Sequence, residues 1–296
     1  MRYLSPLRYP GGKARMAPIF QSIISEQRPR PTVYVEPYAG GAGAALSLLF
    51  NEVVDHVVLN DLNRGIAQFW RSVFHDTEEF VDLVLATKPT VEEWFRQREV
   101  YQDPDSRGIG LAFATFFLNR TNRSGIFDAG PIGGMDQSGR WKIDARYNPT
   151  GLAKRLIKVG SYRHRVEVRE EEGVQVVEKF TERSLDTFSY IDPPYLGQGD
   201  RLYLNTLSWE DHVRLAKALT RNPAYWLLTY DKDDRVHEEL YPDNPCALFG
   251  ISHTAGPQHV GSEYLISSQG LYISGFKGVG ERSAFWLEGR EPTRSH

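Results

Sequence analysis

A strand, a glycine-rich turn, a helix and a second strand follow one another within about 30 residues near the start of the chain. The first strand is expected at residues 33–35, and three glycines and the apolar stretch 44–50 follow it. Residues 54–59 form the second expected strand, which ends at Asn60 and Asp61. This order is typical of parallel β-sheets with crossover helices, so the sequence predicts an α/β fold.

Stretches of strand character return only in the second half of the chain. They lie at residues 166–168, 188–191, 225–230, 264–266 and 271–273. We expect the last two to form a closing antiparallel pair. Before residue 225 a helix is expected to begin with Ser208 as its N-cap, because Asp211 stands three residues further on.

The long interval between the second and third expected strands is mostly helical and basic. Between Arg107 and Arg165 eleven Lys and Arg stand against three acids, which gives this segment a charge of +8. The whole chain carries −3, so the remaining residues carry −11. Such a segment is typical of a surface that binds phosphates, although a solvated face paired with acids elsewhere fits it equally. The sequence thus predicts a doubly wound, Rossmann-like domain at residues 1–66 and 161–282, an insertion at 67–160 and a polar tail at 283–296.

Composition excludes several classes of protein. With Cys246 as the only cysteine, the chain forms no internal disulfide, Cys-rich zinc site or iron–sulfur cluster, which fits a reducing cytoplasm. No apolar run approaches the roughly 18–20 residues of a membrane span, and residues 1–11 lack the apolar core of a signal peptide. The eight histidines are scattered without metal-ligand spacing. We expect a cytoplasmic protein that binds neither membrane nor metal.

The tetrapeptide Asp192-Pro193-Pro194-Tyr195 directly follows an expected strand. Two prolines cannot continue a central strand, so the chain turns outward at the carboxyl edge of the sheet, where open α/β sheets bind their ligands. The turn presents a carboxylate at Asp192, a backbone carbonyl at Pro193 and an aromatic ring at Tyr195. A proline-fixed turn with a packed tyrosine is the alternative interpretation, and the rarity of this tetrapeptide after an apolar strand favours a functional site.

A glycine-rich turn occupies residues 36–43 (Glu-Pro-Tyr-Ala-Gly-Gly-Ala-Gly) at a strand–helix junction. Glycines let a ligand approach backbone N–H groups at the start of a helix. Asp61 stands 21 positions after Gly40, where an acid can accept hydrogen bonds from a ribose. Turn and acid together indicate a cofactor that contains a nucleoside, and NAD remains a candidate at this point.

A third motif, Tyr9-Pro10-Gly11-Gly12-Lys13, superficially resembles a phosphate-binding P-loop, but Leu7 and Ala14 replace the first Gly and the Ser/Thr of that loop. The order of Tyr-Pro-Gly-Gly-Lys, Glu-Pro-Tyr-Ala-Gly-Gly, Asn-Asp-Leu-Asn, a basic insertion and Asp-Pro-Pro-Tyr instead resembles the Dam-type (D12 class) DNA adenine-N6 methyltransferases. The resemblance runs from Leu4 to Ile273 and includes Leu118-Asn119-Arg120 and residues 142–148.

The resemblance implies a class I methyltransferase sheet, S-adenosylmethionine (AdoMet) as methyl donor, double-stranded DNA as substrate and a target-recognition role for the insertion. It places the cofactor against Tyr9, Lys13, Asp61 and Asp192, with a turn of Glu36, Pro37, Tyr38 and Gly40 around its methionine end. The FxGxG motif of the family is Tyr38-Ala39-Gly40-Gly41-Ala42 here, so Ala42 replaces the last glycine and Gly43 follows it. The implied catalytic residues are Asp192, Pro193, Pro194 and Tyr195.

The chemistry of adenine fits these residue types. Adenine N6 is a poor nucleophile because its lone pair is delocalised into the ring. Asp192 and the carbonyl of Pro193 can accept its two N–H bonds, which favours a pyramidal nitrogen whose lone pair points at the sulfonium methyl group. Tyr195 can stack on the base after it has left the duplex. Direct in-line transfer needs neither metal nor covalent intermediate, so positioning and fixed dipoles supply most of the acceleration.

Other functions remain open on the residues alone. Cytosine-C5 enzymes use a Cys nucleophile that follows a Pro, as in Pro245-Cys246, but this dipeptide lies in a loop-like context far beyond Asp192. Asp192 also favours adenine over cytosine-N4 or protein-glutamine methylation. An RNA adenine methyltransferase would carry the same motif and would differ by a preference for the 2′-OH. A DNA-binding protein without catalysis is a further alternative, against which the intact Asp192, Asp61 and Lys13 argue. A cognate restriction nuclease or defence partner, as in restriction–modification, is also expected.

The residues expected to contact DNA lie in the insertion and are Arg120, Asn122, Arg123, Arg140, Lys142 and Arg146. Base specificity should reside in the hairpin after Asn119-Arg120. By the resemblance, members that methylate GATC carry Asn-Arg-x-x-x-Asn-Gly there and soon afterwards an Arg for guanine. Ser124 stands at that second Asn and Asp128 at that Arg. A carboxylate cannot donate the two hydrogen bonds that guanine O6 and N7 require, so the sequence predicts a site other than GATC.

Overall fold

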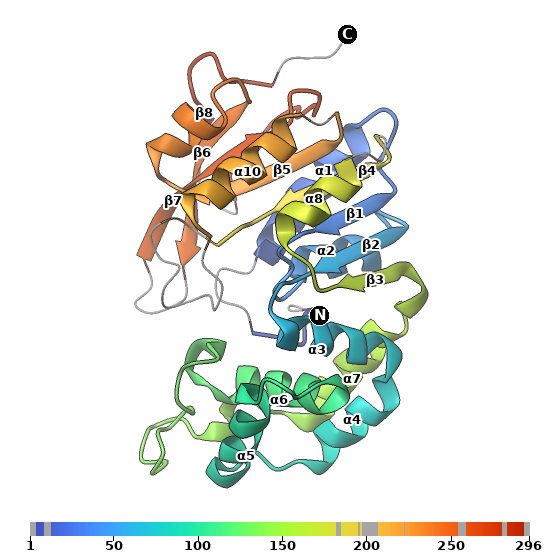
Figure 1. Cartoon of the computed structure of the whole chain (residues 1–296), viewed down its shortest axis with the longest axis vertical. Helices are drawn as coiled ribbons and strands as arrows, with labels where there is room; N and C mark the ends of the chain where they lie inside the picture. The colour runs from blue at the N-terminus through green and yellow to red at the C-terminus, as the bar shows by residue number, and fades with distance from the viewer. Residues whose placement is uncertain are drawn as a thin grey trace.

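The computed structural model describes residues 4–8, 13–181, 185–194, 196, 207–221, 223–253, 259–279 and 283–292. The strands are β1 Val33–Glu36, β2 His56–Asn60, β3 Val166–Arg169, β4 Thr187–Ile191, β5 Tyr225–Asp231, β6 Cys246–His253, β7 His259–Ser267 and β8 Ala284–Trp286. They form one eight-stranded sheet in the order β3-β2-β1-β4-β5-β7-β6-β8 (Figure 1). The α/β fold predicted from the sequence is confirmed.

The sheet has a parallel and an antiparallel part. Strands β1 to β5 run parallel, whereas β7, β6 and β8 run antiparallel to their neighbours. Val35 of β1 stands opposite Val58 of β2 on one side and opposite Ser189 of β4 on the other. The order of strands along the chain therefore reverses between β1 and β4. Open α/β sheets bind ligands at the carboxyl ends of the strands that flank such a reversal.

We expected residues 264–266 and 271–273 to form an antiparallel pair, and this prediction is wrong for residues 271–273, which form no strand. Strand β7 pairs with β5 and with β6, a strand that the sequence pattern did not indicate. The backbone at Tyr272 instead binds a side chain, because its N–H donates to Gln27 Oε1 (3.0 Å) and its carbonyl accepts from Gln27 Nε2 (2.8 Å). Leu271 and Ile273 are buried in the main core, so their apolar character reflects packing and not a strand.

The helices lie on both faces of the sheet and in a separate layer below it in Figure 1. Their bounds are α1 Ala17–Glu26, α2 Gly43–Phe50, α3 Arg64–His75, α4 Thr77–Ala86, α5 Val91–Gln102, α6 Gly108–Thr121, α7 Pro149–Gly160, α8 Gly173–Thr181 and α10 Trp209–Thr220. Short helical turns lie at η1 Lys13–Met16, η2 Arg123–Gly125, η3 Ile143–Arg146, η4 Arg163–Arg165 and η5 Val236–Leu240. Among the described residues, none of these helices has the length and apolar character that crossing a membrane requires.

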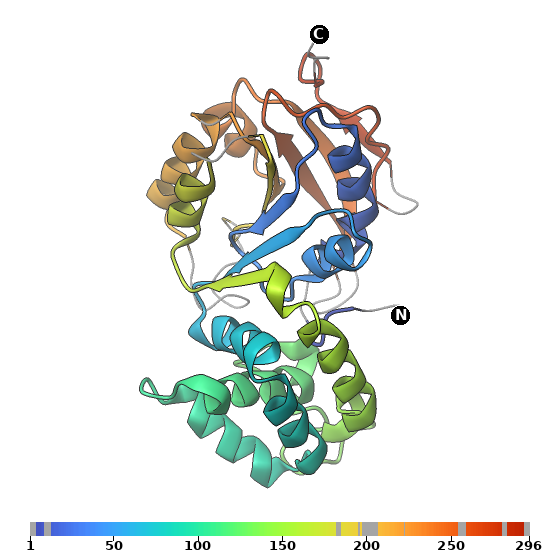
Figure 2. The same cartoon turned by 90° about the vertical axis from the view of Figure 1, so that its right-hand side faces the viewer.

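Three apolar clusters hold the helices on the sheet, the smallest of which packs Val176 and Phe180 of α8 on Val35 and Val58. Helices α1 and α2 cover one face, and α8 and α10 cover the other (Figure 2). Successive residues of β5 point to opposite faces, so Leu227 packs in the core of α1 and α2 and Leu228 in the core of α8 and α10. Helix α10 begins at the expected cap. Ser208 Oγ accepts from the N–H of Asp211 (3.2 Å), and Asp211 Oδ2 accepts from the N–H of Ser208 (3.1 Å).

Helices α3 to α7 leave the sheet after β2 and return to it at β3, as expected for an insertion. Helix α3 begins at Asn63, whose Oδ1 accepts from the N–H of Gly65 (2.9 Å) and of Ile66 (3.3 Å). Helix α6 is the buried centre of the layer, and its Phe116 stacks on Phe69 of α3 with ring centroids 5.8 Å apart. The domain boundaries expected near residues 66 and 160 stay a prediction.

Candidate active site

The carboxyl ends of the parallel strands bring several expected site residues to one edge of the sheet. Glu36 is the last residue of β1, Asp61 directly follows β2, and Asp192 directly follows β4. Lys13, from η1, lies beside Asp192. The expected residues Tyr9 and Tyr195 lie outside the described part of the chain.

Asp192, Lys13 and Glu263 form a cluster of charges. Lys13 Nζ lies 3.2 Å from Asp192 Oδ1 and 2.9 Å from Glu263 Oε2. The side chains of Lys13 and Glu263 are 4% and 1% exposed, whereas that of Asp192 is 21% exposed. Asp192 is therefore the member of the cluster that a substrate can reach.

Two hydroxyl groups continue the cluster into the sheet. Thr229 of β5 donates to Asp192 Oδ1 (2.9 Å), and the hydroxyl of Tyr190 lies 2.7 Å from Thr229 Oγ1. Burial raises the pKa of Tyr190 well above its ordinary value, so its phenol stays protonated and can donate to Thr229. Thr229 and Lys13 both bind Asp192 Oδ1, and together they fix the orientation of this carboxylate.

The charge state of Lys13 follows from its neighbours. Burial alone lowers the pKa of a lysine, because it penalises the charged form. At Lys13 the charges of Asp192 and Glu263 outweigh this effect and raise the pKa above its ordinary value. Lys13 is therefore an ammonium, and the formal charges of Lys13, Asp192 and Glu263 sum to −1. A formal negative charge on this cluster suits a cationic ligand.

Glu36 is buried and binds the start of α2. Its Oε1 accepts from the hydroxyl of Tyr34 (2.8 Å) and from the N–H of Ala45 (3.2 Å). Burial raises the pKa of Glu36 to about 8, so the carboxyl is mostly protonated at neutral pH. Glu36 thus joins the end of β1 to the helix that follows the glycine-rich turn.

Asp61 holds the glycine-rich turn itself. Its Oδ2 accepts from the N–H of Gly40 (2.9 Å), and its Oδ1 accepts from the N–H of Asn63 (2.9 Å). Gly40 has a φ of 45°, in the region that favours glycine, and its carbonyl accepts from Trp70 Nε1 (2.9 Å). Burial raises the pKa of Asp61 to about 6, which leaves it mostly ionised at neutral pH. An acid held in this place after β2 fits the hydroxyls of a ribose.

Pro37 and Tyr38 lead from β1 into the turn. The carbonyl of Pro37 accepts from Asn60 Nδ2 (2.8 Å). Tyr38 packs against the start of α8, where a Cβ added to Gly173 would lie 2.3 Å from Tyr38 Cζ. Glycine at residue 173 therefore makes room for this ring. On the other side of the reversal, Pro193 and Pro194 are buried directly after Asp192.

Four of the six residues expected to contact DNA are exposed on the insertion, namely Arg123, Arg140, Lys142 and Arg146. The guanidinium of Arg140 lies over the ring of Trp141, 5.5 Å from its centroid, and Trp141 is 65% exposed. Hydrogen bonds fix the backbone of this loop, because Gln137 Oε1 accepts from the N–H of Ile143 (2.8 Å) and Gly139 donates to the carbonyl of Gly133 (3.0 Å). The loop thus presents cations and an aromatic ring on an ordered backbone.

The other two, Arg120 and Asn122, have partners in the insertion itself, and Arg120 is half-buried whereas Asn122 is buried. Arg120 Nε donates to the carbonyl of Arg146 (2.8 Å), and burial lowers the pKa of Arg120 to about 9. Asn122 is 0% exposed, and its Oδ1 accepts from Trp94 Nε1 (2.6 Å). Its Nδ2 donates to the carbonyls of residues 126 (2.8 Å) and 127 (3.0 Å). These two side chains shape the loop from inside.

Asn119 ties the start of the chain to the same loop. Its Oδ1 accepts from the N–H of Arg8 (2.7 Å), and its Nδ2 donates to the carbonyls of Arg8 (2.7 Å) and Gly125 (3.1 Å). Gly125 has a φ of 76°, and an added Cβ would lie 2.6 Å from the carbonyl oxygen of Arg8. Arg8 therefore packs directly on the insertion.

Motifs in the sequence did not identify Glu263 or Thr229 as members of the site. Both stand in strands that bring them next to Asp192 only through the order of strands in the sheet. The one local signal is the charge of Glu263 within a strand whose following residues, Tyr264 to Ile266, are apolar and buried. Such a signal becomes specific only when the burial of the strand is known.

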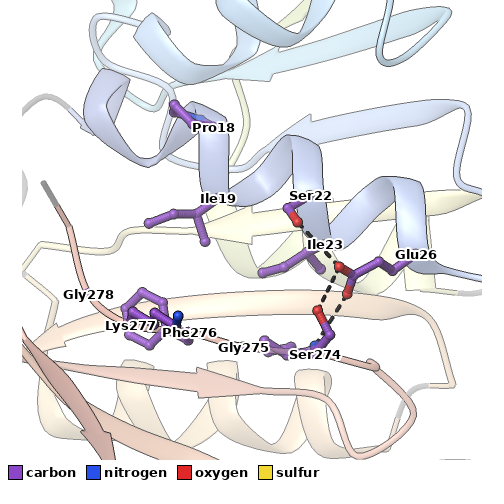
Figure 3. Close-up of a pocket in the computed structure, with 11 residues that line it drawn as sticks. Pro18, Ile19, Ser22, Ile23, Glu26, Ser274, Gly275, Phe276, Lys277 and Gly278 are labelled. Carbon is purple, nitrogen blue, oxygen red and sulfur yellow. Dashed lines mark hydrogen bonds between the residues drawn. The ribbon is translucent and has the colours of Figure 1, made fainter.

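A separate cavity of about 260 Å³ lies between α1 and residues 273–278 (Figure 3). Apolar side chains such as Ile19 and Phe276 line it, and Glu26 closes one end by accepting from Ser274 Oγ (2.7 Å). Its described lining contains none of the expected site residues, so it plays no part in the site at the sheet edge.

Comparison with known proteins gives a family for the chain. The model of the family described as D12 class N6 adenine-specific DNA methyltransferase matches residues 9–253. A comparison with curated proteins gave no match. In the described ranges, no three His, Cys, Asp or Glu side chains are grouped closely enough to hold a metal ion.

Proposed function

Since the chain belongs to the family of D12 class N6 adenine-specific DNA methyltransferases, we propose that it transfers the methyl group of AdoMet to N6 of an adenine in a specific double-stranded DNA sequence. The adenine enters the site as a base flipped out of the duplex. The observation that carries the proposal is the position of Asp192, which follows β4 at the strand reversal, binds Lys13 and remains 21% exposed.

Asp192 acts as the acceptor for the adenine amino group. Its carboxylate and the carbonyl of Pro193 accept hydrogen bonds from the two N–H groups of N6. The nitrogen lone pair is then no longer conjugated with the ring and points at the methyl group. Because Thr229 and Lys13 already hold Asp192, the acceptor needs little reorganisation when the base arrives. Tyr195, which completes the motif, stacks on the flipped base.

AdoMet supplies an electrophilic methyl group on a sulfonium centre. Asp61 would hold its ribose. The turn of Glu36, Pro37, Tyr38 and Gly40 would surround its methionine end. Tyr9 and Lys13, near the N-terminus, would also contact the cofactor. The donor set fits the cofactor in two respects. Asp61 is an ionised acid at the end of β2, and the cluster of Lys13, Asp192 and Glu263 carries a net negative charge.

The exposed face of the insertion binds the DNA backbone. Arg123, Arg140, Lys142 and Arg146 supply positive charges to phosphates, and the exposed ring of Trp141 supplies a surface for a sugar or a base. Arg120 and Asn122 support this face from within and do not need to reach the DNA. The boundaries 67–160 are proposed for this target-recognition domain.

The recognition sequence is proposed to differ from GATC. Ser124 and Asp128, which replace the residues that accompany GATC in the family, are exposed on the loop after α6. Digestion of genomic DNA from expressing cells, with a nuclease that adenine methylation blocks at GATC, tests this proposal. We expect cleavage, and protection of every GATC site would contradict it. A restriction nuclease as partner and a cytoplasmic location stay predictions.

The proposed function is tested by sequencing modified adenines in DNA from cells that express the wild type or the Asp192→Ala variant. We expect N6-methyladenine at one sequence motif with the wild type and none with the variant. Purified protein is then incubated with AdoMet and a duplex of that motif, or with the same sequence as RNA. Methylation of the RNA alone, or AdoMet binding without any transfer, would contradict the proposal.

A further inference from the structure

We propose that Glu263 is a positioning residue for methyl transfer, which holds the Lys13 ammonium so that Asp192 keeps its strength as an acceptor for the adenine amino group. This inference rests on the proposed adenine methylation and extends it to a residue of β7. Glu263 belongs to none of the motifs that indicate the active site.

The geometry shows one cation shared between two carboxylates. Both oxygens of Glu263 accept from Lys13 Nζ, at 3.2 and 2.9 Å, and the same nitrogen lies 3.2 Å from Asp192 Oδ1. The side chain of Glu263 is 1% exposed, so solvent hardly competes for it. Glu263 therefore binds the ammonium on its buried side, and the same ammonium pairs with Asp192 on the other.

Stability alone is a weak reason for these buried charges. Replacing a buried ion pair with an apolar pair of similar volume is often neutral or even stabilising, because both ions lose their hydration. Glu263 also stands in a buried strand, between β5 and β6, where its opposite residues are Asp231 and Phe249. A carboxylate in this place is explained if its pair with Lys13 sets the orientation and acceptor strength of Asp192, the member of the cluster that a substrate can reach.

Removing the charge of Glu263 changes Asp192 in two ways. Lys13 would lose its two hydrogen bonds to Glu263 and bind Asp192 more closely, which draws that carboxylate toward the ammonium and weakens it as an acceptor. The cluster would also change from −1 to neutral, which removes an attraction for a cationic methyl donor. The weaker acceptor should lower kcat, and the lost attraction should raise KM for AdoMet, whereas neither effect acts mainly on the binding of DNA.

The pH dependence has a defined sign. Burial lowers the pKa of Lys13, and the charges of Asp192 and Glu263 more than reverse this effect. Among the described residues, the other titratable groups that face the cluster are Tyr190 on β4, Asp231 on β5 opposite Glu263, and the β1 residues Tyr34 and Glu36, which act on Asp192. Without the charge of Glu263 the pKa of Lys13 falls, so the ammonium is lost at a lower pH. The alkaline limb of kcat should move toward neutral pH.

The experiment compares the full-length wild type with E263Q, E263D and E239Q on a duplex that the wild type methylates. E263Q keeps the shape and removes the charge, E263D keeps the charge, and Glu239 is an exposed residue of η5 that serves as a matched control. We expect E263Q to lower kcat by about 10–100-fold, with KM for DNA within about threefold, and to shift the alkaline limb down by about one pH unit. E263D should retain the position of the alkaline limb, and E239Q should equal the wild type.

The outcomes separate a positioning role from a structural one. Thermal unfolding of each variant gives the folded fraction at the assay temperature. If folded E263Q shows the kcat and the pH profile of the wild type, Glu263 only stabilises the fold and the inference is wrong. If the wild type methylates no adenine in DNA, the proposed function itself fails, and the role of Glu263 fails with it.

Discussion

The sheet edge and the exposed face of the insertion use charged side chains in opposite ways. At the sheet edge Lys13 is 4% exposed and binds two acids, one of them 1% exposed. On the insertion Arg123, Arg140, Lys142 and Arg146 are exposed, and no ion pair joins them to another described residue. Buried, paired charges can orient one reacting group, whereas exposed cations bind phosphates by their number. Changes at the first region should therefore affect kcat, and changes at the second should affect the salt dependence of DNA binding.

The largest effect is expected for Asp192→Ala at the sheet edge. This change removes an acceptor of the adenine amino group, so kcat should fall by at least about 10²–10³-fold, the loss typical of one preorganised hydrogen bond in a transition state. The salt dependence of DNA binding should stay that of the wild type. Single-turnover kinetics and binding titrations at several salt concentrations measure the two quantities. Asp243→Ala, at an exposed acid, is the control. If Asp192→Ala keeps the kcat of the wild type, the sheet edge does not act on kcat, and the distinction between the two regions is wrong.

The same contrast explains which features the sequence could predict. The β1–turn–α2–β2 unit, the strand before Asp192 and the cap of α10 depend on residues close together in the chain, and the structure confirms all three. The pairing of β7 with β5 joins residues 32 to 40 positions apart, and the contact of Glu263 with Lys13 joins residues 250 positions apart, which no local pattern specifies. In the insertion, Asn122 and Arg123 look alike as polar loop residues. Only the packed structure separates the buried side chain from the exposed one.

Asn122→Ala tests the inner side of the insertion and should have the second largest effect. It leaves the buried Trp94 Nε1 and the carbonyls of residues 126 and 127 without their present partner. We expect the free energy of unfolding to fall by about 3 kcal/mol, since buried polar groups without partners cost about 1–3 kcal/mol. Chemical denaturation measures this loss. Arg123→Ala, one residue further on and exposed, should leave the free energy of unfolding within about 0.5 kcal/mol. Equal losses would show that the inner and outer sides are not distinct.

Trp141→Ala tests whether the exposed ring contributes to binding beyond charge. The ring is 65% exposed under the guanidinium of Arg140, so its loss should hardly change stability. We expect weaker DNA binding by about 1–2 kcal/mol, within the range for an aromatic ring that stacks on a nucleic acid, and an unchanged salt slope. Fluorescence anisotropy with a labelled duplex measures both. Leu85→Ala, at a residue of α4 that is 51% exposed, is the matched control and should bind as the wild type does. A similar loss in both variants would argue against a specific role of the ring.

The smallest effect is expected for Arg123→Ala, and it is the sharpest measure of the outer face. An arginine that neutralises one phosphate releases about one counterion, so its removal should reduce the slope of log K against log salt by about one unit. Arg96 provides the matched control, because it is an exposed arginine on the same insertion whose guanidinium already pairs with Glu92 (2.9 Å) and Glu93 (3.1 Å). A cation that is neutralised by acids on its own helix has little charge left for DNA, so Arg96→Ala should leave the slope unchanged. Binding titrations of a cognate duplex over a range of salt concentrations compare the two variants directly. If Arg96→Ala lowers the slope as much as Arg123→Ala does, the DNA-binding face is not the one formed by Arg123, Arg140, Lys142 and Arg146.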